Sequence, residues 1–438
     1  MKSNSNKSSR RSFLANAGLG LAAAGSASTT GINFAEAAEN TPVTIKDVQV
    51  MTVGGQRTYT FVRTVTNDGM YGIGEAYGTP GVGIAEQILS LKPQLVGKNP
   101  LEIDKIYTFL GVGAPSLAGT RTDGSSHNLM RAASGIEMAL WDLAGKILET
   151  PSSVLLGGRF REHVRVYDHS HPRDMMDKAS CREWADKVRA DSNGFTAHKI
   201  DFSRNEDIWS SGKGFADSGR DPANRQLSTQ ELIRVAKSFE NVREAIGWDH
   251  DIMVHCHWEF DVGSALELAR AVAPMKPLWL EDPLQVPYTD SWTRLTEESP
   301  VRILTGENLE RVGGFVPFLI NQGCDIANPD LRNSGGFLES KRIADFASVF
   351  GVPMTVHNTG SQLYTWQACQ WASSIRDFMM VETVTGQGGW MDQLLKIDGR
   401  YIEKGHVKVS NKPGTGAELN REVVQAHLVA GQTWWGDL

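Results

Sequence analysis

The chain has 438 residues, of which 40% are hydrophobic and 22% are charged, and it carries a formal net charge of −7. This length is sufficient for two or more domains with sizeable cores. The acidic balance, with no long run of Lys and Arg after residue 11, excludes a general surface for nucleic acid or anionic membranes. We therefore expect a small-molecule partner.

The first forty residues have the composition of a targeting segment. Arg10 and Arg11 precede a small, apolar run over residues 15–24, and an A-x-A type cleavage site lies near residue 38. This order resembles a twin-arginine export signal, which carries folded proteins across a membrane. We predict a signal peptide at 1–38. The mature protein is expected to be soluble and periplasmic or secreted, because no later stretch reaches the roughly 18 apolar residues of a membrane helix.

Cysteine usage is low for an exported chain of this size. The spacing of the four residues matches no metal ribbon, and two of them lie in apolar, strand-like segments where a buried thiol is ordinary. We predict no essential disulfide among Cys181, Cys256, Cys324 and Cys369.

The mature chain begins with alternating apolar residues that predict a small antiparallel sheet. Asn67-Asp68-Gly69 is a hairpin signal between the second and third strands. Helical patterns follow, and then a Gly- and Ser-rich stretch at 111–126 that predicts a loop. We expect strands at 43–53, 59–65 and up to Glu75, and helices at 84–95 and 102–109.

From residue 163 onward, strand patterns alternate with amphipathic segments that are long enough to be crossover helices. Eight such strands predict an α/β fold with a (β/α)₈ barrel, whose active site lies at the carboxyl ends of its strands. The expected strands are 164–168, 196–201, 252–257, 278–281, 301–306, 324–328, 352–357 and 378–382.

Polar residues recur at or just after the ends of successive strands. The steps between them are 24, 26, 23, 27 and 25 residues, for the set His257, Glu281, Glu307, Asp330, His357 and Glu382. Side chains alternate along a strand, so His255 is expected to project with His257, and Lys199 with Asp201.

Crowded carboxylates raise one another's pKa unless a cation lies between them. Glu281 and Glu307 are therefore predicted to bind a hard divalent ion, magnesium or manganese.

The stretch 133–146, with Pro151 and the Leu-Leu-Gly-Gly of 155–158, resembles the first sequence pattern of the mandelate racemase and muconate lactonising enzymes, within the enolase superfamily. The resemblance implies an N-terminal α+β capping domain at 43–160 and a modified barrel at 161–400. It also implies that the segment 401–438 returns to the capping domain, and that the protein is a homo-oligomer.

The resemblance places a third metal ligand at position 255, where the family carries Asp and this chain carries His255. Imidazole removes one negative charge and shifts the preference from magnesium towards manganese, iron or zinc. Three hypotheses stay open. The ion is bound by His255, Glu281 and Glu307, which we favour; it is bound weakly by the two glutamates; or the site has lost its metal. Magnesium is the expected ion, with manganese or another transition metal as the alternative.

Asp330 and His357 resemble a proton-transfer dyad of the mandelate racemase branch. The carboxylate would fix the tautomer of the imidazole and raise its basicity, so His357 is the candidate base. Abstraction of a proton next to a carboxylate needs the metal and nearby donors to stabilise the resulting enediolate. Glu382 resembles a glutamate that contacts the substrate in this branch.

A second proton-transfer group is expected opposite His357. Lys199 resembles the first lysine of the family's Lys-x-Lys, but the second position is Asp201, which disfavours racemisation and is assigned to substrate binding. His257 resembles the histidine that acid-sugar dehydratases use as general acid, where it would protonate a departing β-hydroxyl. Lys199 would then hold or polarise the substrate carboxylate.

The sequence thus predicts a metal-dependent dehydratase that converts a sugar acid into a 2-keto-3-deoxy acid. Two alternatives stay open. One is an epimerase, racemase or cycloisomerase that uses the same proton abstraction. The other is a non-catalytic protein that binds sugar acids and has a degenerate metal site. The segments 111–127 and 202–228 are expected to shape the substrate pocket.

Overall fold

The computed structural model describes residues 42–55, 57–78, 83–112, 127–201, 224–384 and 389–436. The predicted signal peptide, and most of the two segments expected to shape the pocket, lie outside these described residues. Within the described ranges, no helix is long and apolar enough to cross a membrane.

The N-terminal part is an antiparallel sheet of β1 (Ile45–Gly54), β2 (Thr58–Thr66) and β3 (Tyr71–Ala76). The long helix α4 (His127–Ile147) packs on it at very short range. A Cβ atom at Gly74 would lie only 2.3 Å from the carbonyl oxygen of Gly135, so this approach requires glycine. Helix α2 (Ile84–Leu95) has the predicted bounds, whereas α3 (Ile103–Tyr107) ends early and continues as the π-helical turn Thr108–Val112.

The second part is a closed parallel barrel, because β11 pairs with β4 as well as with β10. All eight strands occur where the sequence predicts them, most of them shorter, and the predicted fold class is confirmed. They are β4 (His163–His169), β5 (Ala197–Asp201), β6 (Asp251–His255), β7 (Leu280–Glu281), β8 (Ile303–Thr305), β9 (Ile326–Ala327), β10 (Met354–Val356) and β11 (Phe378–Thr383).

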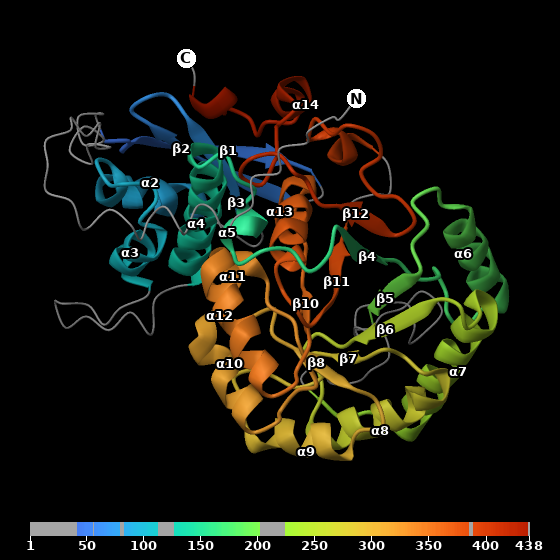
Figure 1. Ribbon diagram of the computed structural model, residues 1–438. Helices are drawn as coiled ribbons and strands as arrows, with labels where there is room; N and C mark the ends of the chain where they lie inside the picture. The colour runs from blue at the N-terminus through green and yellow to red at the C-terminus, as the bar shows by residue number, and fades with distance from the viewer. Residues whose placement is uncertain are drawn as a thin grey trace, which may run out of the picture. The chain divides into compact units, whose positions relative to one another are not determined.

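Helices cover the outside of the barrel (Figure 1). The largest apolar cluster of the described residues lies between these helices and the strands. Cys181, Cys256, Cys324 and Cys369 are all buried free thiols. The helices are α6 (Lys178–Ala190), α7 (Thr229–Ile246), α8 (Val262–Val272), α9 (Asp290–Glu298), α10 (Arg311–Ile320), α11 (Leu331–Ser334), α12 (Gly336–Val349) and α13 (Gln362–Ser373).

The barrel interior has an apolar floor below a polar mouth. Tyr167, Trp279, Leu304 and Ile326 belong to one buried inner cluster. Because side chains on one face of a strand recur every second residue, most of the apolar floor residues are followed by a polar one at the mouth. This applies to Ala197 before Lys199, Met253 before His255, Trp279 before Glu281, and Met380 before Glu382.

One expected strand ends earlier than predicted, with a consequence for the site. β6 ends at His255, and His257 and Trp258 follow it in the left-handed region, with φ of 52° and 59°. His257 therefore reaches the mouth through a turn and not through strand alternation.

The C-terminal segment first extends the barrel sheet. The short strand β12 (His406–Lys408) pairs antiparallel with β4. Val424 of helix α14 (Arg421–Ala426), and Trp435 after it, pack with β1 and β2 residues such as Phe61. The chain thus contacts the barrel before it returns to the first sheet.

Candidate active site

The barrel brings the predicted site residues together at the carboxyl ends of its strands. Contacts join all nine of them into one continuous network. They divide into two groups that differ in how their polar atoms are satisfied.

The first group is an open cluster of His255, Glu281, Asp282 and Glu307, which all lie within metal-binding reach of one another. The Nε2 atom of His255 is 3.8 Å from Glu307 Oε2, 3.9 Å from Asp282 Oδ2 and 4.0 Å from Glu281 Oε1. Three of these atoms, His255 Nε2, Asp282 Oδ2 and Glu307 Oε2, are buried and have no hydrogen-bond partner among the described residues. Buried polar atoms are rarely left so, and the defect points to a missing partner.

The electrostatics of the open cluster favour a bound cation. Burial and the neighbouring Glu307 raise the pKa of Asp282 to about 8. Burial opposes protonation of His255, but Glu281, the hydrogen bond to Asp201 and Glu307 outweigh it and raise its pKa to about 9. The carboxylates of the cluster thus favour a positive charge beside them. Three carboxylates and one imidazole form a donor set that suits magnesium or manganese, so the residues fit a divalent ion.

Asp282 is a member of the open cluster that sequence reasoning missed. It follows Glu281 directly, so strand alternation would place it on the opposite face. Its backbone instead takes a left-handed conformation, with φ of 45°, and Thr305 donates a 2.5 Å hydrogen bond to its Oδ1. The available signal was the Glu281-Asp282-Pro283 sequence, since a turn after the strand can rotate the second carboxylate towards the mouth.

The second group is a dyad network centred on Asp330. The Nδ1 of His357 is 2.9 Å from Asp330 Oδ2. Arg332 donates to both oxygens of Asp330, at 3.1 Å and 2.7 Å, and the Tyr364 hydroxyl donates to Oδ1 at 3.0 Å. Burial opposes ionisation, but Arg332 and His357 hold the pKa of Asp330 below its usual range. The Asp330 carboxylate is thus fully satisfied and rigidly held.

The dyad network continues into the N-terminal sheet. Arg332 Nη1 is 3.0 Å from Glu75 Oε1 on β3, and the Ser361 amide also donates to that oxygen, at 3.1 Å. Sequence reasoning missed Arg332 and Tyr364. The signal for Arg332 was its position two residues after Asp330, where an arginine can fold back onto the carboxylate.

His357 connects the two groups. Its Nε2 lies 3.4 Å from Glu307 Oε2 in the open cluster, while its Nδ1 contacts Asp330. Burial opposes the imidazolium, but Glu307 and the hydrogen bond to Asp330 raise the pKa of His357 to about 10.

Lys199 and Glu382 form a buried ion pair. The Lys199 ammonium is 2.6 Å from Glu382 Oε1 and 3.2 Å from Glu281 Oε1. The other oxygen of Glu382 accepts a hydrogen bond from the backbone N–H of Asn358 at 3.0 Å. Burial opposes the charge on Lys199, but Glu281 and Glu382 raise its pKa well above the usual value. Both side chains are already engaged within the protein.

His257 stands at the edge of the open cluster. Its ring centroid is 3.8 Å from that of His255, and its Nε2 is 3.8 Å from Asp201 Oδ1. Burial and the neighbouring His255 lower the pKa of His257 to about 3. His257 is therefore neutral while His255 is charged.

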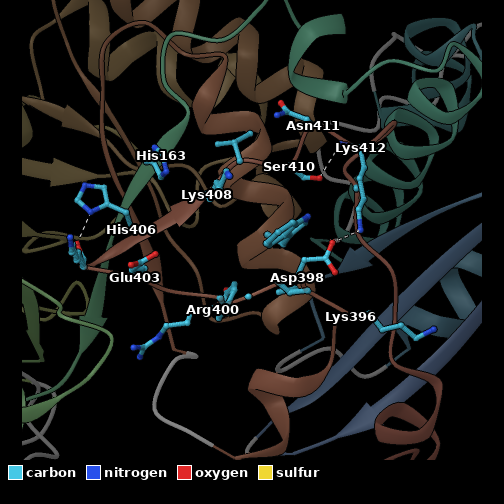
Figure 2. Close-up of a pocket in the computed structure, with 17 residues that line it drawn as sticks. His163, Lys396, Asp398, Arg400, Glu403, His406, Lys408, Ser410, Asn411 and Lys412 are labelled. Carbon is cyan, nitrogen blue, oxygen red and sulfur yellow. Dashed lines mark hydrogen bonds and ion pairs between the residues drawn. The ribbon is translucent and has the colours of Figure 1, made fainter.

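A separate hollow of about 930 Å³ lies beside the amino end of β4, away from the mouth (Figure 2). None of the predicted site residues lines it within the described part of the chain. Two of its lysines are engaged in ion pairs: Lys412 pairs with Asp398 at 3.3 Å, and Lys396 with Glu418 at 2.6 Å. We assign the chemistry to the mouth and not to this hollow.

Comparison with known families agrees with the fold. Residues 30–157 match the mandelate racemase / muconate lactonizing enzyme N-terminal domain, and residues 181–423 match the enolase C-terminal domain-like family. The chain belongs to the mandelate racemase and muconate lactonizing branch of the enolase superfamily, and the predicted resemblance is confirmed.

Individual relatives cover most of the chain. A D-xylonate dehydratase of Haloferax volcanii is 36% identical over 390 residues, 89% of this chain and 90% of the relative. A D-galactarolactone cycloisomerase of Agrobacterium fabrum is 29% identical and covers 84% of this chain and 91% of the relative. The crystal structure of a mandelate racemase/muconate lactonizing enzyme-like protein from Rubrobacter xylanophilus has a TM-score of 0.79 at 28% identity, and covers 90% of this chain and 100% of that chain.

Proposed function

We propose that this protein is a metal-dependent dehydratase of an acid sugar, a hydro-lyase that forms a 2-keto-3-deoxy acid. The observation that carries the proposal is the position of His357, which is held by Asp330 on one side and faces the open cluster on the other. Relatives named dehydratases of D-xylonate, D-gluconate and D-galactonate support the same reaction class.

His255, Glu281 and Glu307 are the proposed metal ligands, and Asp282 joins them as a fourth candidate. A bound divalent ion would supply positive charge beside the substrate carboxylate, which makes the α-proton more acidic. Carboxylates favour magnesium, and the single imidazole among them makes a transition metal such as manganese the alternative.

His357 is the proposed base. Asp330 fixes its Nδ1, so Nε2 is the atom that faces the mouth and would take the α-proton. Glu307 holds a proton on His357 when the carboxylate charge is uncompensated, since it raises the pKa of His357 to about 10. His357 can therefore act as the base only when a cation balances the negative charge of the open cluster.

His257 is the proposed acid that protonates the departing β-hydroxyl. Its Nδ1 is buried and has no hydrogen-bond partner among the described residues, so a substrate hydroxyl would satisfy it. Burial and the charged His255 lower its pKa. A His255 that binds a metal is neutral and no longer contributes the second of these two effects.

We also propose a different role for two residues of the predicted site. Lys199 was expected to hold the substrate carboxylate, and Glu382 to contact the substrate. Lys199 and Glu382 form an ion pair at 2.6 Å and are almost fully buried. We therefore propose that this pair positions Glu281, which Lys199 also contacts, instead of binding the substrate.

A cycloisomerase is the second candidate, because a relative of that name covers 84% of the chain and would need the same proton abstraction. The test is incubation of the purified mature protein with Mg²⁺ or Mn²⁺ and a panel of aldonates and aldarolactones. A 2-keto-3-deoxy acid supports dehydration. Isomerised substrate without a keto acid would favour the second candidate, and binding without turnover would favour a non-catalytic protein.

Periplasmic or secreted location and a homo-oligomeric state stay predictions. Export rests on the arginine pair and apolar run of the first 38 residues. Fractionation of cells that express the full chain should find the processed protein outside the cytoplasm. Full-length protein confined to the cytoplasm would contradict export, and sedimentation of a monomer would contradict the oligomer.

A further inference from the structure

We propose that Asp201 is a positioning residue that fixes the tautomer of His255 and thereby turns Nε2 of His255 towards the metal. The inference rests on the proposed metal site. It replaces the sequence-based expectation that Asp201 contacts the substrate.

The contact is built into the barrel sheet. Asp201 and His255 are paired positions on the parallel strands β5 and β6, so both side chains project to the same side. The Nδ1 of His255 lies 3.1 Å from Asp201 Oδ1. Neither side chain has to leave its strand geometry to make this hydrogen bond.

The contact decides which nitrogen of His255 is available. A neutral imidazole carries one N–H, and a carboxylate only accepts hydrogen bonds. With the proton on Nδ1, the Nε2 lone pair faces Glu307, Asp282 and Glu281, at 3.8 to 4.0 Å. With the proton on Nε2, the Nδ1 lone pair would face the Asp201 carboxylate, which is unfavourable. A carboxylate behind a ligating histidine fixes its orientation and raises its basicity.

Asp201 is itself held in place from the other side. Its Oδ2 lies 2.7 Å from Nε2 of His169, at the end of β4, while Oδ1 faces His255. Only 14% of the Asp201 side chain is exposed. Both oxygens thus face histidines of the neighbouring strands, which leaves little of the carboxylate for a substrate.

The arrangement also restores charge. A cluster with imidazole in place of a carboxylate lacks one negative charge, and Asp201 supplies that charge directly behind the imidazole. A His255→Asp substitution would place two carboxylates at paired positions of β5 and β6, where they repel each other.

The test measures metal binding by the protein without substrate. The Kd of Mn²⁺ and Mg²⁺ is determined by calorimetry for the wild type, Asp201→Asn and His255→Ala, and for the double variant. Asp186→Asn, which removes one carboxylate from an 80% exposed site on α6, is the charge control. We expect Asp201→Asn to weaken Mn²⁺ binding about 10- to 100-fold and the control to leave it unchanged.

The double variant separates positioning from direct ligation. If Asp201 acts through His255, its substitution adds less than about twofold in the His255→Ala background, because the two effects are not independent. A loss of the same size in both backgrounds would mean that Asp201 ligates the ion itself and would overturn the inference. Unchanged affinity in Asp201→Asn alone would also overturn it, with the proposed function intact. If the wild type binds neither ion, the proposed function fails first. Apo-protein unfolding of each variant confirms that it is folded.

Discussion

The two halves of the barrel mouth are equally buried but differ in how their polar atoms are satisfied. In the dyad network, Arg332 bonds both oxygens of Asp330 and also reaches Glu75. In the open cluster, His255, Asp282 and Glu307 each keep a buried polar atom without a partner among the described residues. A buried polar group without a partner is costly, so the second half is the one that gains most from an external cation. The polar atoms of the dyad network are thus satisfied within the chain, whereas those of the open cluster would be satisfied by a bound cation.

The largest effect on stability is expected from a substitution in the dyad network. Arg332→Met keeps most of the side-chain volume but removes the charge that balances Asp330 and Glu75. Since it leaves buried carboxylates uncompensated, we expect the free energy of unfolding to fall by roughly 3–5 kcal/mol in a urea titration. Arg342→Met is the matched control, because this arginine pairs with Asp104 at 43% exposure and its loss should cost less than about 1 kcal/mol. Equal effects of the two substitutions would contradict the comparison.

The residue between the halves should control chemistry more than stability. His357→Asn removes the proposed base while the amide can still bond Asp330. We expect kcat to fall about 10³-fold, the usual range for a general base, and deuterium exchange at the substrate α-carbon to fall with it. Exchange at the wild-type rate in this variant would show that another group abstracts the proton.

Binding of a divalent ion to the open cluster should stabilise the folded protein. At a concentration 100 times its Kd, a divalent ion that binds only the folded chain adds about 2.7 kcal/mol to the free energy of unfolding. Chelator-treated protein titrated with Mg²⁺ or Mn²⁺ should show this gain, and Glu307→Gln should lose most of it. Glu244→Gln, 59% exposed on α7, is the control. An equal gain in Glu307→Gln would exclude Glu307 as a ligand.

The smallest expected effect is the loss of stability at acid pH that Asp330 of the dyad network contributes. Burial opposes ionisation, but Arg332 and His357 lower the pKa of Asp330 below its unfolded value of about 3.9. The unfolded chain therefore binds the proton first as the pH falls. The stabilisation is present above about pH 4 and is lost below it, with a slope of up to about 1.4 kcal/mol per pH unit. Asp330→Asn should lose this part of the slope between pH 5 and pH 3. Identical slopes in variant and wild type would contradict the assignment.

The positions of the strands and of most mouth residues could be predicted from the sequence. A strand alternates its side chains with period two, and each barrel unit returns the chain to the same end. These regularities are local, so the spacing of Glu281, Glu307, Asp330 and His357 was sufficient to bring them together.

Residues that leave these regularities could not be predicted. Asp282 turns into the cluster because its backbone is left-handed, and period two gives the opposite face. Lys199 was correctly placed on β5, but its ion pair with Glu382 depends on a partner 183 residues away, in a strand that closes the barrel. The tie from Arg332 to Glu75 joins two parts of the chain that no local pattern relates.

The most direct test of the proposed reaction follows one proton in D₂O. The metal-loaded protein is incubated with D-xylonate and related aldonates, and the products are followed by NMR. Dehydration removes the C2 proton and the C3 hydroxyl, and the resulting enol takes a solvent deuteron at C3 when it becomes a ketone. We predict a 2-keto-3-deoxy acid with one deuterium at C3, formed by the wild type and not by His357→Asn. Accumulation of substrate or epimer that carries deuterium at C2, without any keto acid, would contradict the proposed dehydration.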